Sequence, residues 1–269
     1  MRVLVLVVNY KLNVFYSKTL KSISTLPYEI KKNIDVFVWD NIPYKENENL
    51  ISKMLSDVPH HYSPSDDNVS LSRIYNIVIN SLGDAYELLI IFDNDTFVTD
   101  LYFDKLLKEA NNNTLINLFL PQVRFKSKLV SPAKLLFCKG YHCEKFNLGP
   151  NLANSVTAIN SGMAIRVGYL KTSGFKYNEK NHFYGTDDDF MLNYCRFQNS
   201  FFMLDYVLEH SLSKYNEEEI KIKVWRFDDQ INGLVNNFSD NLIKSFIVRV
   251  YVSYLKLKFK FRNKLWPGF

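Results

Sequence analysis

The stretch Glu87–Thr96, ELLIIFDNDT, combines an unbroken apolar run with an abrupt acidic end. A continuous run of Leu, Ile and Phe is typical of a strand covered on both faces, as in a parallel sheet. Two earlier runs have the same character, VLVLVV at Val3–Val8 and IDVFVWD at Ile34–Asp40. Helical spacing of apolar residues is found beside these runs, at Val14–Leu26, Asn49–Leu55 and Leu71–Leu82. This alternation predicts an α/β protein with a mostly parallel central sheet flanked by helices.

Beyond residue 100 the alternation is looser. The spacing predicts a helix at 104–110, a long irregular excursion at 121–150 and another helix starting near Asp187. Strands are expected at 115–120, 156–159, 163–167 and 201–208.

Composition narrows the class of protein. The chain has 269 residues, of which 47% are hydrophobic and 23% charged, and this excludes wholesale disorder. Cys138, Cys143 and Cys195 form no CxxC pair, which argues for a reducing, cytoplasmic compartment and against a structural zinc site. The apolar amino terminus has no small-residue cleavage site after it, so it is interpreted as a first strand and not as a signal peptide. No run approaches the roughly 18 apolar residues of a membrane-spanning helix.

Each of the three strong strands ends in polar residues, at Asn9-Tyr10, Asp40-Asn41 and Asp93-Asn94-Asp95. In open parallel sheets, ligands bind outside the carboxyl ends of the strands. Two carboxylates one residue apart repel each other unless a cation lies beside them, and Mg²⁺ or Mn²⁺ takes oxygen ligands together with phosphates. A simple turn, with Thr96 capping the next segment, is the alternative. The chain has no glycine-rich phosphate loop, so a metal would have to neutralise a bound phosphate.

A second acidic cluster, Asp187-Asp188-Asp189, follows Gly185-Thr186. Thr186 and Asp189 have the spacing of a capping box, which would make the cluster an ordinary helix start. Three adjacent carboxylates exceed what capping requires. One of them, enclosed beside other anions, would have a raised pKa and could accept a proton from a hydroxyl group.

Two further polar residues each have two interpretations. His210 follows the strand predicted at 201–208, and it is either a metal ligand beside the carboxylates or an ordinary satisfied histidine. Arg73 lies in the helix start NVSLSRIYN of Asn68–Asn76, where it either faces a diphosphate or carries a solvated helix charge.

Taken together, these motifs resemble those of family 2 glycosyltransferases with the GT-A fold. More narrowly, they resemble the bacterial rhamnosyltransferase-like branch that builds surface polysaccharides such as O-antigen or capsule. The resemblance covers residues 1–215 and is carried, in the family's order, by VVNYK, VFVWDN, NVSLSRIYN, LLIIFDNDT, INSGMAI, the Asp triplet and LDYVLEHSLS. It implies a GT-A domain with a nucleotide-sugar-binding half at 1–100 and an acceptor half at 101–215, followed by a basic, aromatic extension at 216–269.

The resemblance also implies an inverting transfer of a sugar from a UDP- or dTDP-sugar to a hydroxyl group of a glycan or lipid-linked glycan. It gives the general base to Asp187, with Asp188 as the next candidate. Donor contacts are implied for Asn9, Tyr10, Asp40, Asn68, Arg73, Asp93 and Asn94, and ligands of Mn²⁺ or Mg²⁺ for Asp93, Asp95 and His210. The chain departs from the family pattern at Ser70, where glycine is frequent, at the Asp triplet, and at Arg196, two positions beyond the usual arginine.

The segment Lys244–Phe269 carries seven basic side chains and no acidic one. Helical spacing fits 246–255, whereas 255–262 alternates apolar and basic residues with the period of a strand. A basic, aromatic segment suits the surface of an anionic bilayer, which predicts a peripheral protein on the inner face of a bacterial cytoplasmic membrane. A terminal helix packed on the domain is the alternative, and the lack of a recognition motif speaks against nucleic acid as a partner.

Two other functions fit parts of the pattern. A nucleotidyltransferase of related fold is disfavoured because its glycine-rich, lysine-bearing phosphate loop is missing. A non-catalytic carbohydrate- or membrane-binding module would keep the fold with degenerate sites.

Overall fold

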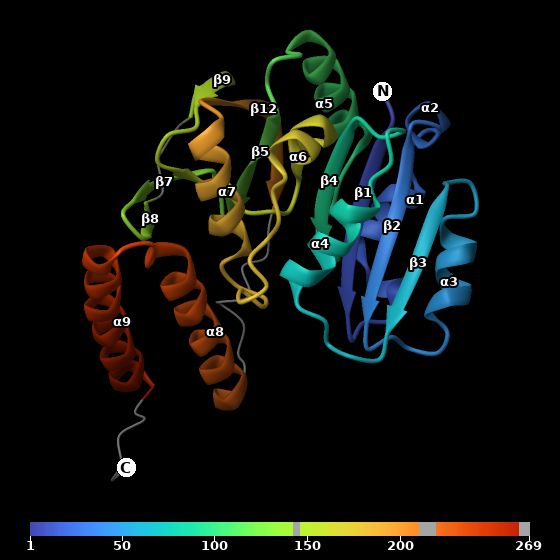
Figure 1. Cartoon of the computed structure of the whole chain (residues 1–269). Helices are drawn as coiled ribbons and strands as arrows, with labels where there is room; N and C mark the ends of the chain where they lie inside the picture. The colour runs from blue at the N-terminus through green and yellow to red at the C-terminus, as the bar shows by residue number, and fades with distance from the viewer. Residues whose placement is uncertain (142–145, 210–218, 264–269) are drawn as a thin grey trace.

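A computed structural model of the chain describes residues 1–141, 146–209 and 219–263 (Figure 1). Its large sheet contains β1 (Val3–Tyr10), β2 (Ile34–Asn41), β3 (His60–Ser65), β4 (Leu88–Asp93), β5 (Leu118–Phe125), β6 (Lys128–Ser131), β9 (Gly149–Leu152), β11 (Met163–Arg166) and β12 (Ser200–Glu209). The strand order is β3-β2-β1-β4-β11-β5-β12-β9, and β6 also pairs with β5. A small second sheet is formed by β7 (Ala133–Leu136), β8 (Lys139–Tyr141) and β10 (Val156–Thr157).

The direction of the strands follows the predicted pattern except at β11, in the centre of the sheet, and at the short strands β6 and β9, which are antiparallel to their neighbours. β1 to β4 run parallel to one another, and β5 runs parallel to β12. β11 is antiparallel to both of its neighbours, β4 and β5, so the two parallel groups point the same way. The sheet is therefore mostly parallel, and the amino-terminal end of β11 lies at the edge where β1, β2 and β4 end.

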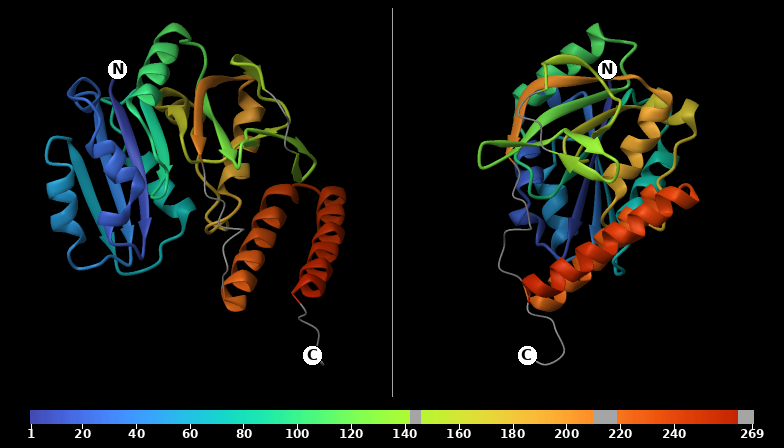
Figure 2. Two further views of the ribbon diagram at one scale, coloured as in Figure 1. Left: turned by 180° about the vertical axis from the view of Figure 1, so that it is seen from behind. Right: turned by 90° about the vertical axis from the view of Figure 1, so that its left-hand side faces the viewer.

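Helices cover both faces of the large sheet, as the views of Figure 2 show. The helices of the described chain are η1 (Val14–Tyr16), α1 (Lys18–Ser24), α2 (Tyr28–Lys31), α3 (Asn47–Met54), α4 (Leu71–Ser81), α5 (Asp100–Asn112), α6 (Val167–Ser173), α7 (Thr186–Phe197), α8 (Ile220–Phe238) and α9 (Leu242–Arg262), of which α8 and α9 lie beside the sheet. Alternate residues of β1 enter different cores: Val5 shares one with Leu20 of α1, and Leu6 shares the other with Ile74 of α4. This burial on two faces is the reason why the strand is apolar throughout.

Two parts of the large sheet differ from the sequence-based expectation. His60–Ser65 forms the edge strand β3, where the sequence shows only a polar stretch; its side chains are largely exposed, and Pro64 is tolerated at an edge. The irregular excursion expected at 121–150 instead continues β5 to Phe125 and contains β6, β7 and β8. β6 and β8 each pair with one neighbour and so lie at sheet edges, and β7 is the middle strand of the small second sheet. Strands of three or four residues are too short to show a clear alternation of buried residues.

The helix expected at Val14–Leu26 is divided into η1 and α1. Ser17 separates them, and its hydroxyl accepts a hydrogen bond from the Leu20 N–H at the start of α1. A side-chain cap of this kind starts a new helix.

The last two helices form a hairpin beside the sheet (Figure 1). α9 is one continuous helix from Leu242 to Arg262, so the strand-like interpretation of 255–262 is wrong. Val248 and Val252 of α9 are buried in a hydrophobic cluster with α8, and Phe259 stacks on Phe227 with ring centroids 4.1 Å apart. Burial at helical spacing outweighs the alternation of residue types. In the described part of the chain no helix is long and apolar enough to cross a membrane.

Candidate active site

Three segments meet at the edge where the parallel strands end: Asp93–Thr96 after β4, Asn160–Gly162 before β11, and the start of α7. The Asp93 N–H donates a hydrogen bond to Ser161 Oγ at 3.1 Å, and Thr96 Oγ1 lies 2.8 Å from the same oxygen. The Asn160 N–H donates to Asp187 Oδ1 at 3.2 Å. The two acidic clusters of the sequence are thus joined through the turn before β11.

This turn depends on Gly162. The residue has a φ of +83°, and a Cβ at this position would lie 2.3 Å from Leu208 Cδ1. Only glycine adopts such a backbone conformation without strain and leaves room for the neighbouring chain. Its carbonyl oxygen accepts a hydrogen bond from the Tyr102 hydroxyl at 2.8 Å, which fixes the turn to α5.

Asp187 is half-buried at the start of α7. Desolvation raises the pKa of Asp187 to about 8, and the negative charges of Asp188 and Asp93 add to the shift. Among the described residues the Asn160 N–H is the donor that reaches this carboxylate, and one such bond does not offset the loss of water. A carboxylate with this pKa takes up a proton readily near neutral pH, as a general base must.

The other two members of the Asp triplet are held by protein donors. Asp188 Oδ1 accepts a hydrogen bond from Thr157 Oγ1 at 2.5 Å, and Asp189 Oδ2 accepts one from the Asn178 N–H at 2.7 Å. Burial raises the pKa of both carboxyl groups. Because the N-cap of α7 is Gly185, which has no side chain to cap the helix, the capping-box alternative is wrong.

An open pocket of about 330 Å³ lies against Asp187 and Asp188. Gly185 lines it from the loop before α7, and Gln230 and Leu234 line it from α8. The pocket gives a second molecule access to the Asp187 carboxylate.

Helix α8 holds the loop Phe183–Gly185, which leads into Asp187. Asp229 Oδ2 accepts hydrogen bonds from two backbone N–H groups of this loop, both at 3.0 Å. One turn later, a Cβ at Gly233 would lie 2.9 Å from a carbonyl oxygen of the loop, so only glycine permits this approach. After a further turn, Asn237 Nδ2 donates to the Gly185 carbonyl oxygen at 2.7 Å. Sequence reasoning missed this wall of the site because its contacts join residues 45 to 52 positions apart.

One carboxylate oxygen of Asp95 accepts no hydrogen bond from the described residues. This atom, Oδ1, is buried, and such an orphaned atom indicates a missing cation or water. The described ranges contain no group of three or more His, Cys, Asp or Glu that could hold a metal. Mg²⁺ usually binds through one or two carboxylates plus substrate phosphates, so Asp95 fits a metal shared with a donor. His210 lies outside the described residues.

Asn9 and Asp40 form a fully buried network at the ends of β1 and β2. Asp40 accepts hydrogen bonds from Asn9 Nδ2 at 2.8 Å and from Asn47 Nδ2 at 2.7 Å. It also accepts one from the Tyr62 hydroxyl at 3.0 Å, and Asn9 Oδ1 accepts one from Asn94 Nδ2 at 3.1 Å. Since all these bonds are internal, the network fixes the ends of β1 and β2, and the predicted direct donor contact with Asn9 or Asp40 would require it to open.

Other residues predicted to contact the donor reach the surface. Tyr10 is 46% exposed at the end of β1, and Asn68 and Arg73 are exposed around the start of α4. Asn41 of β2 fixes this helix start, because its Nδ2 donates to the Val69 carbonyl oxygen at 2.8 Å. Their role in donor binding stays a prediction.

Comparison with solved structures finds the fold of S. aureus TarS. The crystal structure of TarS 1–349 in complex with UDP-GlcNAc matches with a TM-score of 0.60 and 13% identity, over 92% of this chain and 69% of that chain. The complex of TarS 1–349 with UDP gives 0.56 and 11%, over 92% and 68%. The crystal structure of TarS gives 0.54 and 12%, over 91% of this chain and 45% of that chain. No family model matches the sequence, and no curated protein does.

This likeness confirms the predicted fold class, a GT-A glycosyltransferase fold with a mostly parallel sheet flanked by helices. At 11% to 13% identity it shows the fold alone. It does not extend to the rhamnosyltransferase-like branch that the motifs resemble.

Proposed function

We propose that this protein is an inverting glycosyltransferase that moves a sugar from a nucleotide-diphosphate donor to a hydroxyl group of a glycan or lipid-linked glycan. The observation that carries the proposal is Asp187, a desolvated carboxyl group with a raised pKa beside an open pocket. The GT-A fold, shared with TarS complexes that contain UDP and UDP-GlcNAc, supports a UDP- or dTDP-sugar as the donor. The sequence motifs favour the rhamnosyltransferase-like branch of surface-polysaccharide synthesis.

Asp187 performs the proton transfer of the reaction. Its carboxylate removes the proton from the acceptor hydroxyl as the acceptor oxygen bonds to the anomeric carbon of the sugar. The bond from that carbon to the nucleotide diphosphate breaks on the opposite face, and its electron pair leaves with the phosphate, so the configuration inverts. General-base assistance of this kind contributes roughly 10²–10⁴ in rate.

Asp95, with Asp93 beside it, is the residue that would hold Mn²⁺ or Mg²⁺. Such a cation, when bound, neutralises charge on the departing diphosphate. The protein's own part is to fix the segment: the Asp93 backbone is tied to Ser161, and Asn94 is tied to Asn9. Tyr10, Asn68 and Arg73 are the exposed candidates for holding the donor on this side.

A panel of UDP- and dTDP-sugars tests the proposal on the purified protein. We expect a donor to raise the melting temperature, because it binds only the native state, and we expect slow donor hydrolysis, both enhanced by Mn²⁺. Release of pyrophosphate from a nucleoside triphosphate would instead identify a nucleotidyltransferase. Glycan binding with no donor turnover would identify a non-catalytic module, and either result overturns the proposal.

A further inference from the structure

Helix α9 has two apolar faces. One packs on α8 through buried residues such as Val248 and Val252. The opposite face carries a row of large apolar side chains, here called the α9 stripe, and they are 45% to 79% exposed: Ile243, Phe246, Ile247, Val250, Tyr254, Leu257 and Phe261. Their spacing of three and four residues places them on one side of the helix.

The α9 stripe lies on the outside of the molecule. In the right-hand view of Figure 2, α9 crosses in front of the other elements and none covers it. A surface helix normally turns its polar face to water and its apolar face to the core. An extended apolar face exposed in this way marks a surface that binds a partner.

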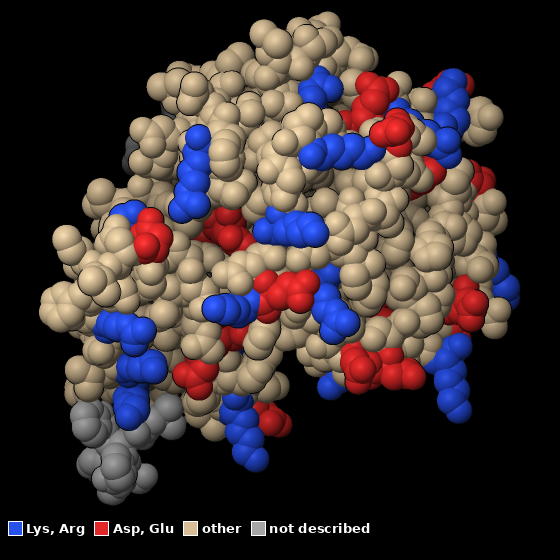
Figure 3. Space-filling model, viewed as in Figure 1, with Lys and Arg blue, Asp and Glu red and all other residues tan. Residues whose placement is uncertain are grey.

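Basic side chains border the α9 stripe on both sides. Helical geometry places Lys244, Lys258 and Arg262 on one side of it and Lys260 on the other. Leu242–Arg262 contains no acidic residue. Figure 3 shows Lys and Arg side chains in a row at the lower left, over α9, beside an uncharged margin.

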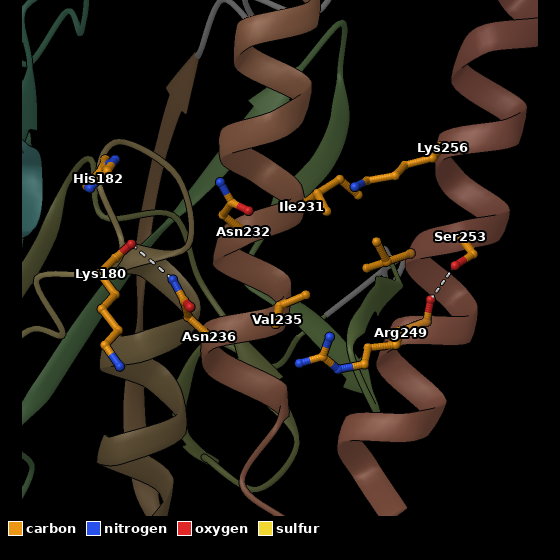
Figure 4. Close-up of a pocket in the computed structure, with 10 residues that line it drawn as sticks. Lys180, His182, Ile231, Asn232, Val235, Asn236, Arg249, Ser253 and Lys256 are labelled. Carbon is orange, nitrogen blue, oxygen red and sulfur yellow. Dashed lines mark hydrogen bonds between the residues drawn. The ribbon is translucent and has the colours of Figure 1, made fainter. Parts of the chain in front are cut away.

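A second group of basic side chains lines a pocket between α8, α9 and the loop before α7. The pocket of about 650 Å³ is lined by Lys180, Arg249 and Lys256, and the described lining includes no acidic side chain. Figure 4 shows Arg249 and Lys256 extending from α9 toward α8. These side chains add to the positive potential at the same end of the molecule.

We infer that α9 docks on the surface of an anionic lipid bilayer. The α9 stripe inserts among the lipid headgroups, and the bordering lysines and arginine pair with lipid phosphates. The inference does not rest on the proposed transfer reaction, because membrane binding is measured without turnover.

A second copy of the chain is the competing occupant of this face. Ile243, Ile247 and Val250 begin a four-three spacing that is also found in coiled coils. Pairing two α9 helices through the stripe would bring two basic borders together with no acidic residue of α9 between them, and facing like charges oppose association. An anionic bilayer supplies the missing negative charge.

Flotation of the full chain with vesicles tests the role of the stripe. A triple variant removes apolar area without changing the charge: Phe246→Gln, Leu257→Gln and Phe261→Gln. We expect its partition onto phosphatidylglycerol-containing vesicles to fall by about tenfold or more. A control variant removes three similarly exposed side chains outside α9, with 90%, 73% and 63% exposure, and should bind like the parent: Leu115→Gln, Leu152→Gln and Phe197→Gln.

A second triple variant tests the charges that border the stripe: Lys244→Gln, Lys258→Gln and Lys260→Gln. We expect binding to phosphatidylglycerol-containing vesicles to weaken by about tenfold or more and to become less sensitive to salt. Binding to pure phosphatidylcholine should be weak for the parent and the variant alike.

Three results overturn the inference. One is equal binding of the parent to anionic and neutral vesicles, and another is a loss in the control variant as large as in the stripe variant. The third is a parent protein that does not bind vesicles but self-associates in light scattering, together with a stripe variant that is monomeric. That result identifies a second copy of the chain as the occupant. All substituted side chains are exposed, and equal melting temperatures establish that the variants are folded.

Discussion

Asp40 and Asp187 lie at the same edge of the sheet, and their surroundings are opposite. Asp40 is fully buried and accepts hydrogen bonds from three side chains at 2.7 to 3.0 Å. Asp187 accepts one from the Asn160 N–H at 3.2 Å, as far as the described residues show, and its charged neighbours are Asp188 and Asp93. A carboxylate with satisfied oxygens stabilises the fold, whereas one that is desolvated and crowded by anions is ready to bind a proton.

The comparison separates two kinds of acidic residue that look alike in the sequence. Asp40 is the second-last residue of β2 and Asp187 is the second residue of α7, and each has a polar residue beside it. The difference lies in the donors that the fold brings to each carboxylate, so substitutions at the two positions should have opposite consequences.

The largest effect is expected for catalysis. Asp187→Asn should lower the rate of sugar transfer by roughly 10²–10⁴, because the amide cannot take the acceptor proton, while donor binding in a thermal shift assay stays unchanged. Asp40→Asn is the matched control, and its folded fraction should keep most of its activity. If Asp187→Asn transfers sugar at the rate of the parent, Asp187 does not differ from Asp40 in catalytic importance.

The pH dependence of the rate should follow the Asp187 carboxyl group. The active form is deprotonated, so kcat/KM should rise about tenfold per pH unit below the pKa of about 8 and level off above it. A profile that stays flat between about pH 6 and 9 contradicts the assignment of Asp187 as the base.

Stability should depend on Asp40. Asp40→Ala leaves Asn9, Asn47 and Tyr62 without their acceptor in a buried place, so the free energy of unfolding should fall by about 3 kcal/mol or more. Denaturant unfolding measures this change. Asp84→Ala, at a fully exposed position that pairs with Lys171, serves as the control and should unfold like the parent.

The enclosure of Asp187 can be tested through α8. Gly233→Ala puts a methyl group 2.9 Å from the Tyr184 carbonyl oxygen, so the helix must move away from the loop. Water would then reach Asp187, and we expect the rise of the pH–rate profile to shift to lower pH and the rate to fall about tenfold. Gly168→Ala in α6 has open space around the new methyl group. This control should leave both the pH–rate profile and the rate unchanged.

A smaller effect with the opposite sign is expected for the stability of Asp187 variants. Folding raises the pKa of Asp187 from 3.8 to about 8. The protonated group therefore contributes to the free energy of unfolding in full below about pH 4, and this contribution is lost as the pH rises through 8. Asp187→Asn should therefore melt about 5 °C higher than the parent at pH 9, with the difference vanishing near pH 4. If Asp187→Asn melts at or below the temperature of the parent at pH 9, the Asp187 carboxylate is not destabilised by burial and by neighbouring negative charges.

The sequence predicts the parts of the fold in which both faces of a strand are buried. β1 and β4 are continuous apolar runs and β2 is interrupted only by Asp35 before its polar end, so their type and position follow from residue pattern alone. β3, β6 and β8 could not be found in this way, because exposed edges place little demand on residue type. β7 is the middle strand of the small sheet, but its four residues are too few to show a pattern. The alternation in α9 misleads because packing against α8 decides the helix.

The candidate site shows the same division. Chain order places Asp93 and Asp95 at the mouth of a strand, so a site at this edge is predictable. The donors that satisfy Asp40 come from β1, α3 and β3, and the contacts made by Asp229 and Gly233 come from the distant helix α8. Such partners are set by tertiary packing, and a single sequence carries no local pattern for them.

The reversed strand β11 has a consequence for how the chain assembles. It covers the side of β4 that β1 does not, pairing Met163 with Ile91 and Arg166 with Leu88. A nascent chain ending at residue 100 would display a bare, apolar strand edge, which is a template for intermolecular pairing and aggregation. The apolar edge of β4 is therefore protected from aggregation during synthesis only after the segment that forms β11 has emerged from the ribosome.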